Sequence, residues 1–120
     1  MSISNGIAQF IELTVSLDNG KLCFSYSNGN NPIEVTQKGT ITYQLIDNTA
    51  KGLKFVGAAF DAPFAGLIDS ATVSNDGKML QLLDLDNASG AASFRFIFSN
   101  AENTLMLVSP DPQIINKDKR

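Results

Sequence analysis

The side chains that carry most enzyme chemistry are scarce in this sequence. It contains no histidine and a single cysteine, Cys23. Without histidine, the Ser-His-Asp and Cys-His arrangements that activate a nucleophile are excluded, and so is imidazole acid–base catalysis. Histidine is also the commonest ligand of zinc, copper and non-haem iron in proteins. The residue types therefore favour a protein without a catalytic centre, and they predict no cofactor and no metal site.

Cys23 is the one thiol that could act as a nucleophile. It stands in the alternating segment Lys21 to Ser27, on the opposite face from Leu22, Phe24 and Tyr26, and the sequence places no base beside it. We therefore interpret Cys23 as a small strand residue. A single cysteine also rules out an internal disulfide bond, which fits a reducing compartment.

Carboxylates are the remaining candidates for acid–base or cation chemistry. Asp84 and Asp86 are two residues apart on an expected strand, so they share a face and could offer hard oxygen ligands to a cation. The residues that follow depart from the pattern of a calcium loop, and we interpret the pair as a solvated strand end. A hydrolase that uses carboxylates alone would need a pair such as Asp61 and Asp69, which the sequence does not place together.

The elements that must position these side chains are strands. In Thr40 to Asp47, for example, Ile41, Tyr43 and Leu45 alternate with polar residues, which is the period of a half-buried strand. Asn19-Gly20 and Asp76-Gly77 predict two hairpin turns. The whole pattern predicts an all-β fold, an antiparallel β-sandwich of about seven to nine short strands.

Three segments carry predictions about burial. In the first strand, Ile11, Leu13, Val15 and Leu17 are expected to share an apolar face. Phe94, Phe96 and Phe98 are expected at its centre, where each would contribute about 2–3 kcal/mol on full burial. Leu53 to Phe60 is apolar on both faces, as expected of a strand that is covered on both sides or lies against a partner.

Length and charge limit the remaining possibilities. The 120 residues predict one domain, with a sandwich over residues 1–109 and a C-terminal extension over residues 110–120. The net charge is −3 although the last four residues are basic, and an acidic body predicts no binding to nucleic acid. No basic leader or stretch of about 20 apolar residues is present, so we expect a soluble, cytoplasmic protein that does not bind a membrane.

Two loops are candidates for a small ligand, because the loops of a sandwich often carry its function. In the Asn28–Pro32 and Asp61–Gly66 loops, an aromatic ring could stack on a sugar and amides could hydrogen-bond to it. The residues concerned are Asn28, Asn30, Asn31, Asp61 and Phe64. The alternative is that both loops are ordinary connections.

The last apolar segment is the best candidate for an interaction with a protein. Pro110 and Pro112 lack amide donors and must interrupt a strand ladder, and Asp111 is held extended before Pro112. Ile114 and Ile115 follow, and exposing both to water would be costly. They either pack on the same domain or are buried against another chain, for example by strand addition to a sheet edge.

The stretch LMLVSPDPQIINK, from Leu105 to Lys117, resembles the C-terminal signature of the bacterial DP-EP family, whose name refers to two dipeptides. Asp111-Pro112 matches the first of them, and no Glu-Pro occurs in the chain. Gly39 to Leu45 and Phe55 to Gly57 are also similar to that family and, more distantly, to PixA/AidA-type bacterial inclusion-body proteins. The resemblance implies an immunoglobulin-like sandwich and no catalytic activity.

The sequence thus predicts a non-enzymatic β-sandwich that acts by protein–protein interaction or self-assembly, as a homodimer or larger homo-oligomer. A carbohydrate-binding module is the first alternative, and a carboxylate-only hydrolase is the second.

Overall fold

A computed structural model describes residues 7–29, 33–35, 37–60, 67–85, 90–110 and 113–116. The regular structure in these residues consists of ten strands: β1 (Ile7–Asp18), β2 (Lys21–Tyr26), β3 (Ile33–Val35), β4 (Gly39–Asp47), β5 (Lys54–Phe60), β6 (Ser70–Val73), β7 (Met79–Asp84), β8 (Gly90–Ser99), β9 (Met106–Val108) and β10 (Gln113–Asn116). This part of the chain contains no helix that is long and apolar enough to cross a membrane.

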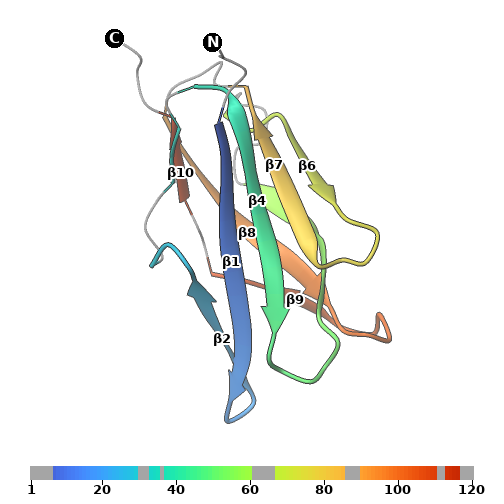
Figure 1. Cartoon of the computed structure of the whole chain (residues 1–120). Helices are drawn as coiled ribbons and strands as arrows, with labels where there is room; N and C mark the ends of the chain where they lie inside the picture. The colour runs from blue at the N-terminus through green and yellow to red at the C-terminus, as the bar shows by residue number, and fades with distance from the viewer. Residues whose placement is uncertain are drawn as a thin grey trace.

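The strands form two sheets. The first has the order β2-β1-β4-β7-β6, and the second has the order β3-β10-β8-β5, with β9 also paired to β8. Figure 1 shows the first sheet in front of the long diagonal β8 of the second. The predicted all-β fold in two sheets is confirmed.

The expected antiparallel arrangement is wrong for two strand pairs. β1 runs parallel to β4, and β3 runs parallel to β10. A tight hairpin forces its two strands to be antiparallel, whereas strands joined by longer connections can pair in either direction. Neither of these pairs is joined by a hairpin, and sequence alternation says nothing about direction, so both sheets are mixed.

Both predicted hairpin turns are confirmed. Asn19 and Gly20, with φ angles of 52° and 81°, connect β1 to β2 in a two-residue turn that pairs Asp18 with Lys21. Such a turn needs positive φ at both central residues, which asparagine and glycine adopt at low cost. In the β6–β7 turn, Asp76 Oδ1 accepts hydrogen bonds from Ser74 Oγ at 2.6 Å and from Lys78 N at 2.9 Å.

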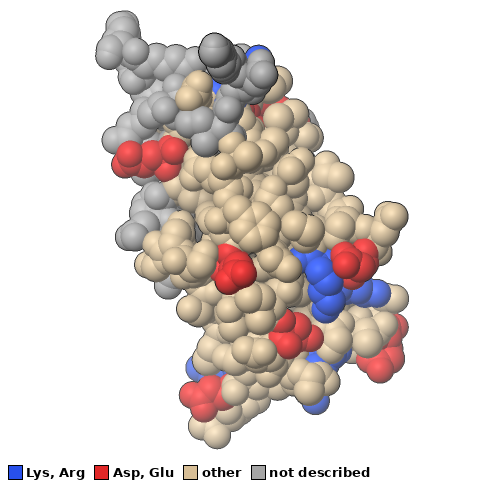
Figure 2. All heavy atoms as spheres, in the orientation of Figure 1, with Lys and Arg blue, Asp and Glu red and all other residues tan. Residues whose placement is uncertain are grey.

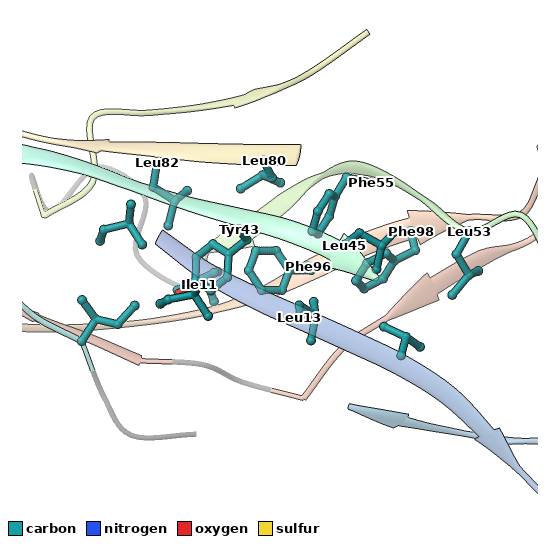
Figure 3. Packing of buried hydrophobic residues seen from close by; sticks show 14 of the residues in the cluster. Ile11, Leu13, Tyr43, Leu45, Leu53, Phe55, Leu80, Leu82, Phe96 and Phe98 are labelled. Atoms are coloured by element: carbon teal, nitrogen blue, oxygen red, sulfur yellow. The ribbon is translucent and has the colours of Figure 1, made fainter. Parts of the chain in front are cut away.

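The core lies between the sheets and is built around aromatic rings, as Figure 3 shows. Phe94, Phe96 and Phe98 are almost completely buried, which confirms their predicted position. The ring of Tyr43 on β4 meets that of Phe96 on β8 edge to face, with 4.6 Å between centroids. This contact joins the central strands of the two sheets, so the strong alternation of β4 and β8 defines the middle of the molecule.

Two apolar segments are less buried than their sequence suggests. Leu17 is 38 % exposed near the end of β1, whereas Ile11, Leu13 and Val15 on the same face are buried. β5 is not covered on both sides, because it is an edge strand of the second sheet and Val56 is 46 % exposed. The other expectation, that this strand lies against a partner, stays a prediction. A β-bulge between Phe55 and Gly57 shifts the register and leaves Val56 unpaired with β8.

Candidate functional site: β9 and the groove beside it

The structure does not support carboxylate chemistry at the predicted positions that it describes. Asp84 is 1 % exposed, so its interpretation as a solvated strand end is wrong. It follows Leu80 and Leu82 on the inward face of β7. Asp69 accepts a hydrogen bond from Leu85 N at 2.7 Å, which joins the start of β6 to the end of β7. Asp61 and Asp86 lie outside the described residues, within which no cluster of three or more potential ligands could hold a metal ion.

The other predicted site residues are described only in part. Cys23 is exposed on β2. Asn28 is half-buried in the turn after β2, whereas Asn30, Asn31, Asp61 and Phe64 lie outside the described residues. A carbohydrate site in these two loops therefore stays a prediction.

The C-terminal segment forms a strand within its own domain. β10 pairs antiparallel with β8 and parallel with β3, so both of its hydrogen-bonding edges are occupied. Pro110 is exposed, Asp111 and Pro112 lie outside the described residues, and only the backbone of Ile114 and Ile115 is described. An interaction role for these five residues stays a prediction, but β10 offers no free edge for strand addition.

Ser109 fixes the point at which β9 ends. Its amide donates to Phe96 O at 3.0 Å, and its Oγ accepts from Phe96 N at 2.8 Å. The same hydroxyl donates to Pro110 O at 2.9 Å. The side chain of Ser109, which is 1 % exposed, therefore replaces the backbone acceptor that β9 would otherwise present to Phe96.

An apolar groove opens at the end of the sandwich where β2 and β9 lie. Its volume is about 710 Å³, and five leucines line it: Leu17, Leu22, Leu53, Leu105 and Leu107. Lys51, Asn100 and Glu102 are its main polar neighbours. The lining contains no aromatic side chain, so the groove lacks the flat surface on which sugar rings stack, and it suits aliphatic groups.

Two loops hold the groove in shape. In the β4–β5 loop, Asp47 Oδ1 accepts hydrogen bonds from the amide and hydroxyl of Thr49, and Asp47 Oδ2 accepts from Leu53 N at 2.9 Å. Burial by itself would raise the pKa of Asp47, but the hydrogen bonds from Thr49 and Leu53 and the charge of Lys78 bring it below its ordinary value. The ionised carboxylate is therefore the form that organises this loop.

The β8–β9 loop is organised by Asn100 in the same way. Asn100 Oδ1 accepts from Thr104 N at 2.9 Å and from Leu105 N at 3.1 Å. The two loops also touch, because Ala101 N donates to Lys51 O at 3.2 Å. A Cβ on Gly52, whose φ is +67°, would lie 2.7 Å from Ala101 Cβ, so only glycine allows this approach.

β9 exposes more apolar surface than its length would suggest. Leu105, Met106 and Val108 are 63 %, 71 % and 52 % exposed, and Leu107 alone packs partly against the core. Val108 is paired with Ile97 on the outer face of the second sheet. Sequence reasoning missed this surface, although three successive apolar residues in a strand must place at least one on the solvent side.

The outer face of the first sheet is different in character. Thr14, Thr42 and Gln81 lie on it, and its exposed apolar residues Phe10 and Met79 pair with Thr42 and Gln44. Single apolar residues of this kind are usual on protein surfaces. Figure 2 shows the molecule from the side of this sheet, where basic side chains of the described residues lie beside acidic ones and form no extended basic area.

The five edge strands of the described residues are not equally protected against pairing with another chain. Lysine or glutamate marks three of them (Lys21 in β2, Glu34 in β3, Lys54 in β5), and exposed Ser70 and Thr72 mark β6. β5 also carries the bulge. Charges, bulges and polar side chains are the usual protections of an edge. β9 has only its shortness and the proline that follows it.

The profile of the DP-EP family matches residues 9–118. The chain belongs to the DP-EP family. The match holds although the chain contains Asp111-Pro112 and no Glu-Pro. A search of curated proteins found no match to this DP-EP protein.

Solved structures resemble the DP-EP chain in fold at low identity. The inclusion body protein PixA from Burkholderia cenocepacia is 9 % identical, with a TM-score of 0.52 over 94 % of this chain and 98 % of its own. A cysteine protease inhibitor from Entamoeba histolytica is 12 % identical, with a TM-score of 0.44 over 92 % of this chain and 97 % of its own. At 9 % identity, the likeness to PixA concerns the fold alone.

Proposed function

We propose that this DP-EP protein is a non-enzymatic interaction domain that self-associates through the apolar surface along Leu105 to Val108. The observation that carries the proposal is the exposure of Leu105, Met106 and Val108, each more than half exposed, beside an apolar groove. Removing such side chains from water is the main driving force of protein association. We also propose that the two sheets form an immunoglobulin-like sandwich, a fold that suits an interaction domain.

The absence of histidine from the sequence supports a role without catalysis. Three of the carboxylates that the structure describes accept backbone hydrogen bonds: Asp47 and Asp76 in loops, and Asp69 between the ends of β6 and β7. A carboxylate fixed in this way is held by the fold and is not directed at a substrate. Self-association needs none of these groups.

The first prediction tests the proposal by light scattering coupled to size-exclusion chromatography. We expect the wild-type protein to elute as a dimer or larger species at micromolar concentrations. Met106→Lys should yield monomer, because it places a charge on the exposed apolar surface while its side chain points to solvent. Thr14→Lys is the matched control on the polar face, and it should keep the wild-type mass.

A monomeric wild-type protein at all concentrations tested would rule out self-association. An oligomer that Met106→Lys leaves intact would show that another surface makes the contact.

A further inference from the structure

We infer that β9 is itself the contact between two copies: their β9 strands pair antiparallel, edge to edge, about a two-fold axis through Leu107. The inference rests on the proposed self-association and specifies how the copies meet. The second sheets of the two copies would then form one continuous sheet, with the order β5-β8-β9 followed by the same strands of the partner in reverse. The partner is a second copy of this chain.

The direction of the backbone groups supports this pairing. Ser109 N donates to Phe96 O, so residue 109 turns its amide toward β8. Leu105 O also faces β8, where it accepts from Ser99 Oγ at 2.9 Å. Because successive residues of a strand direct these groups to opposite sides, Met106 and Val108 direct theirs away from β8, and among the described residues β9 pairs with β8 alone.

This free edge is complementary to itself. With Leu107 on the two-fold axis, Met106 lies opposite the partner's Val108, and Val108 lies opposite the partner's Met106. Each of these is a hydrogen-bonded pair, because both residues direct their N–H and C=O groups outward. The register with Leu107 on the axis therefore uses every backbone group that β9 leaves free, and a two-fold axis repeats each contact.

The side chains fit the same register. Met106 and Val108 lie on the outer face, where each would meet an apolar partner across the strands. Leu105 and Leu107 lie on the inner face and line the groove. The partner's Leu105 and Leu107 would adjoin them and cover apolar surface that one copy leaves exposed.

The charges around the groove and the unprotected edge of β9 indicate that the partner is a second copy of this chain. Lys51 and Glu102 both line the groove, so a two-fold partner can bring each cation toward an anion of the other copy. β9 itself carries no charge that would oppose its own copy. A stable dimer buries about 800 Å² per partner, more than a three-residue ladder covers, so the leucines of the groove must contribute to the interface.

Cross-linking distinguishes this geometry from other contacts. In the proposed register Leu107 faces the partner's Leu107 as a non-hydrogen-bonded pair, with about 4.5 Å between Cα atoms. That spacing permits a disulfide bond. In a Cys23→Ser background, Leu107→Cys should therefore form a covalent dimer on mild oxidation. Ser25→Cys in the same background, on the edge strand β2, should remain monomeric on a denaturing gel.

Two charge variants test whether the contact is an edge or a face. Val108→Lys should weaken dimerisation by about 30-fold or more, as expected when a central interface residue is lost. Val56→Lys, across β8 on the outer face and 46 % exposed, should leave the dissociation constant unchanged. Circular dichroism checks that both variants fold, and the solvent-directed Met106→Lys replaces Val108→Lys if the latter unfolds.

The outcomes separate the inference from the proposed function. A dimer that is broken by Val56→Lys, or that fails to cross-link at position 107, overturns the edge pairing and leaves self-association standing. A monomeric wild-type protein overturns both.

Discussion

The carboxylate of Asp47 binds two parts of the β4–β5 loop. One oxygen accepts hydrogen bonds from Thr49, and the other accepts one from the backbone of Leu53. Leu53 is 2 % exposed and lines the groove, so the carboxylate connects a solvent-facing loop to the core. The ionised form makes these bonds, and the pKa of Asp47 lies below its ordinary value in consequence.

A second prediction concerns Asp47→Asn, which keeps the size of the side chain and loses one acceptor. At neutral pH we expect the free energy of unfolding to fall by about 1–2 kcal/mol, because one backbone donor loses its partner. Urea unfolding followed by circular dichroism measures this difference. Asp18→Asn, which removes the same charge from an exposed turn, is the control and should change stability little.

The pH dependence provides a check on the same residue. A carboxyl whose pKa is lower in the folded than in the unfolded state stabilises the fold above its unfolded pKa, and this stabilisation is lost as the pH falls through the folded value. Asp47→Asn should therefore flatten the acid limb of the stability profile. An identical loss of stability below the ordinary pKa of 3.8 in both proteins would contradict this assignment.

At the scale of the elements, one buried hydroxyl joins the residue that follows β9 to the backbone of β8. The hydroxyl of Ser109 accepts from Phe96 N and donates to Pro110 O, so it supplies both an acceptor for β8 and a donor for the carbonyl of the next residue. Alanine has neither group, and Phe96 N would remain buried without its partner.

The third prediction is that Ser109→Ala lowers the free energy of unfolding by about 1–3 kcal/mol, the usual cost of a buried donor without a partner. The amide of Phe96 should also exchange with deuterium faster, which hydrogen-exchange NMR can follow residue by residue. Ser25→Ala, which removes an exposed hydroxyl from β2, is the matched control and should leave stability nearly unchanged. Unchanged exchange at Phe96 would show that the hydroxyl is not its acceptor in solution.

The elements that could be predicted from the sequence are those with strong local signals. Asn19-Gly20 determines a turn by backbone preference, and Phe94, Phe96 and Phe98 indicate a buried face by alternation alone. The direction of β1 against β4 depends on contacts between distant segments, so alternation could not reveal it. The groove was missed for the same reason, because it forms where leucines from β1, β2 and the β8–β9 region converge.

The prediction for Asp84 was wrong for a different reason. A carboxylate at the end of a strand is usually solvated, and nothing in the neighbouring residues signals an exception. Its burial depends on the register of β7 against β4, which pairs Asp84 with Gly39. A local pattern does not determine a register between strands.

At the scale of the whole molecule, two tyrosines report on the joining of the sheets. Burial raises the pKa of Tyr26 to about 12, although the nearby Ser109 hydroxyl opposes part of the rise. Burial, followed by the charge of Tyr26, raises the pKa of Tyr43 still further. The chain has no tryptophan and two tyrosines, so its near-ultraviolet absorbance reports on these two residues.

A fourth prediction follows for alkaline conditions. In the unfolded chain tyrosine ionises near its ordinary pKa of 10.0, whereas Tyr26 in the folded protein resists ionisation to about pH 12. Stability should therefore fall as the pH rises from about 10 to about 12, because only the unfolded state releases the protons there. Tyrosinate absorbance should rise together with the loss of the circular dichroism signal.

Tyr26→Phe is the control for that measurement. It should remove part of the alkaline loss of stability and leave Tyr43 to report on unfolding. Ionisation of both tyrosines at pH 10 in a protein that is still folded would contradict their burial.

The position of β10 has a consequence for how the protein is made. Ile114 pairs with Ile33 on one side and with Ala92 on the other, so β10, which is made after β3 and β8, lies between them in the second sheet. During translation, β3 and β8 emerge from the ribosome without the strand that separates them. The sheet can close only after residues 113–116 have been synthesised, and the pairing of such distant segments is slow.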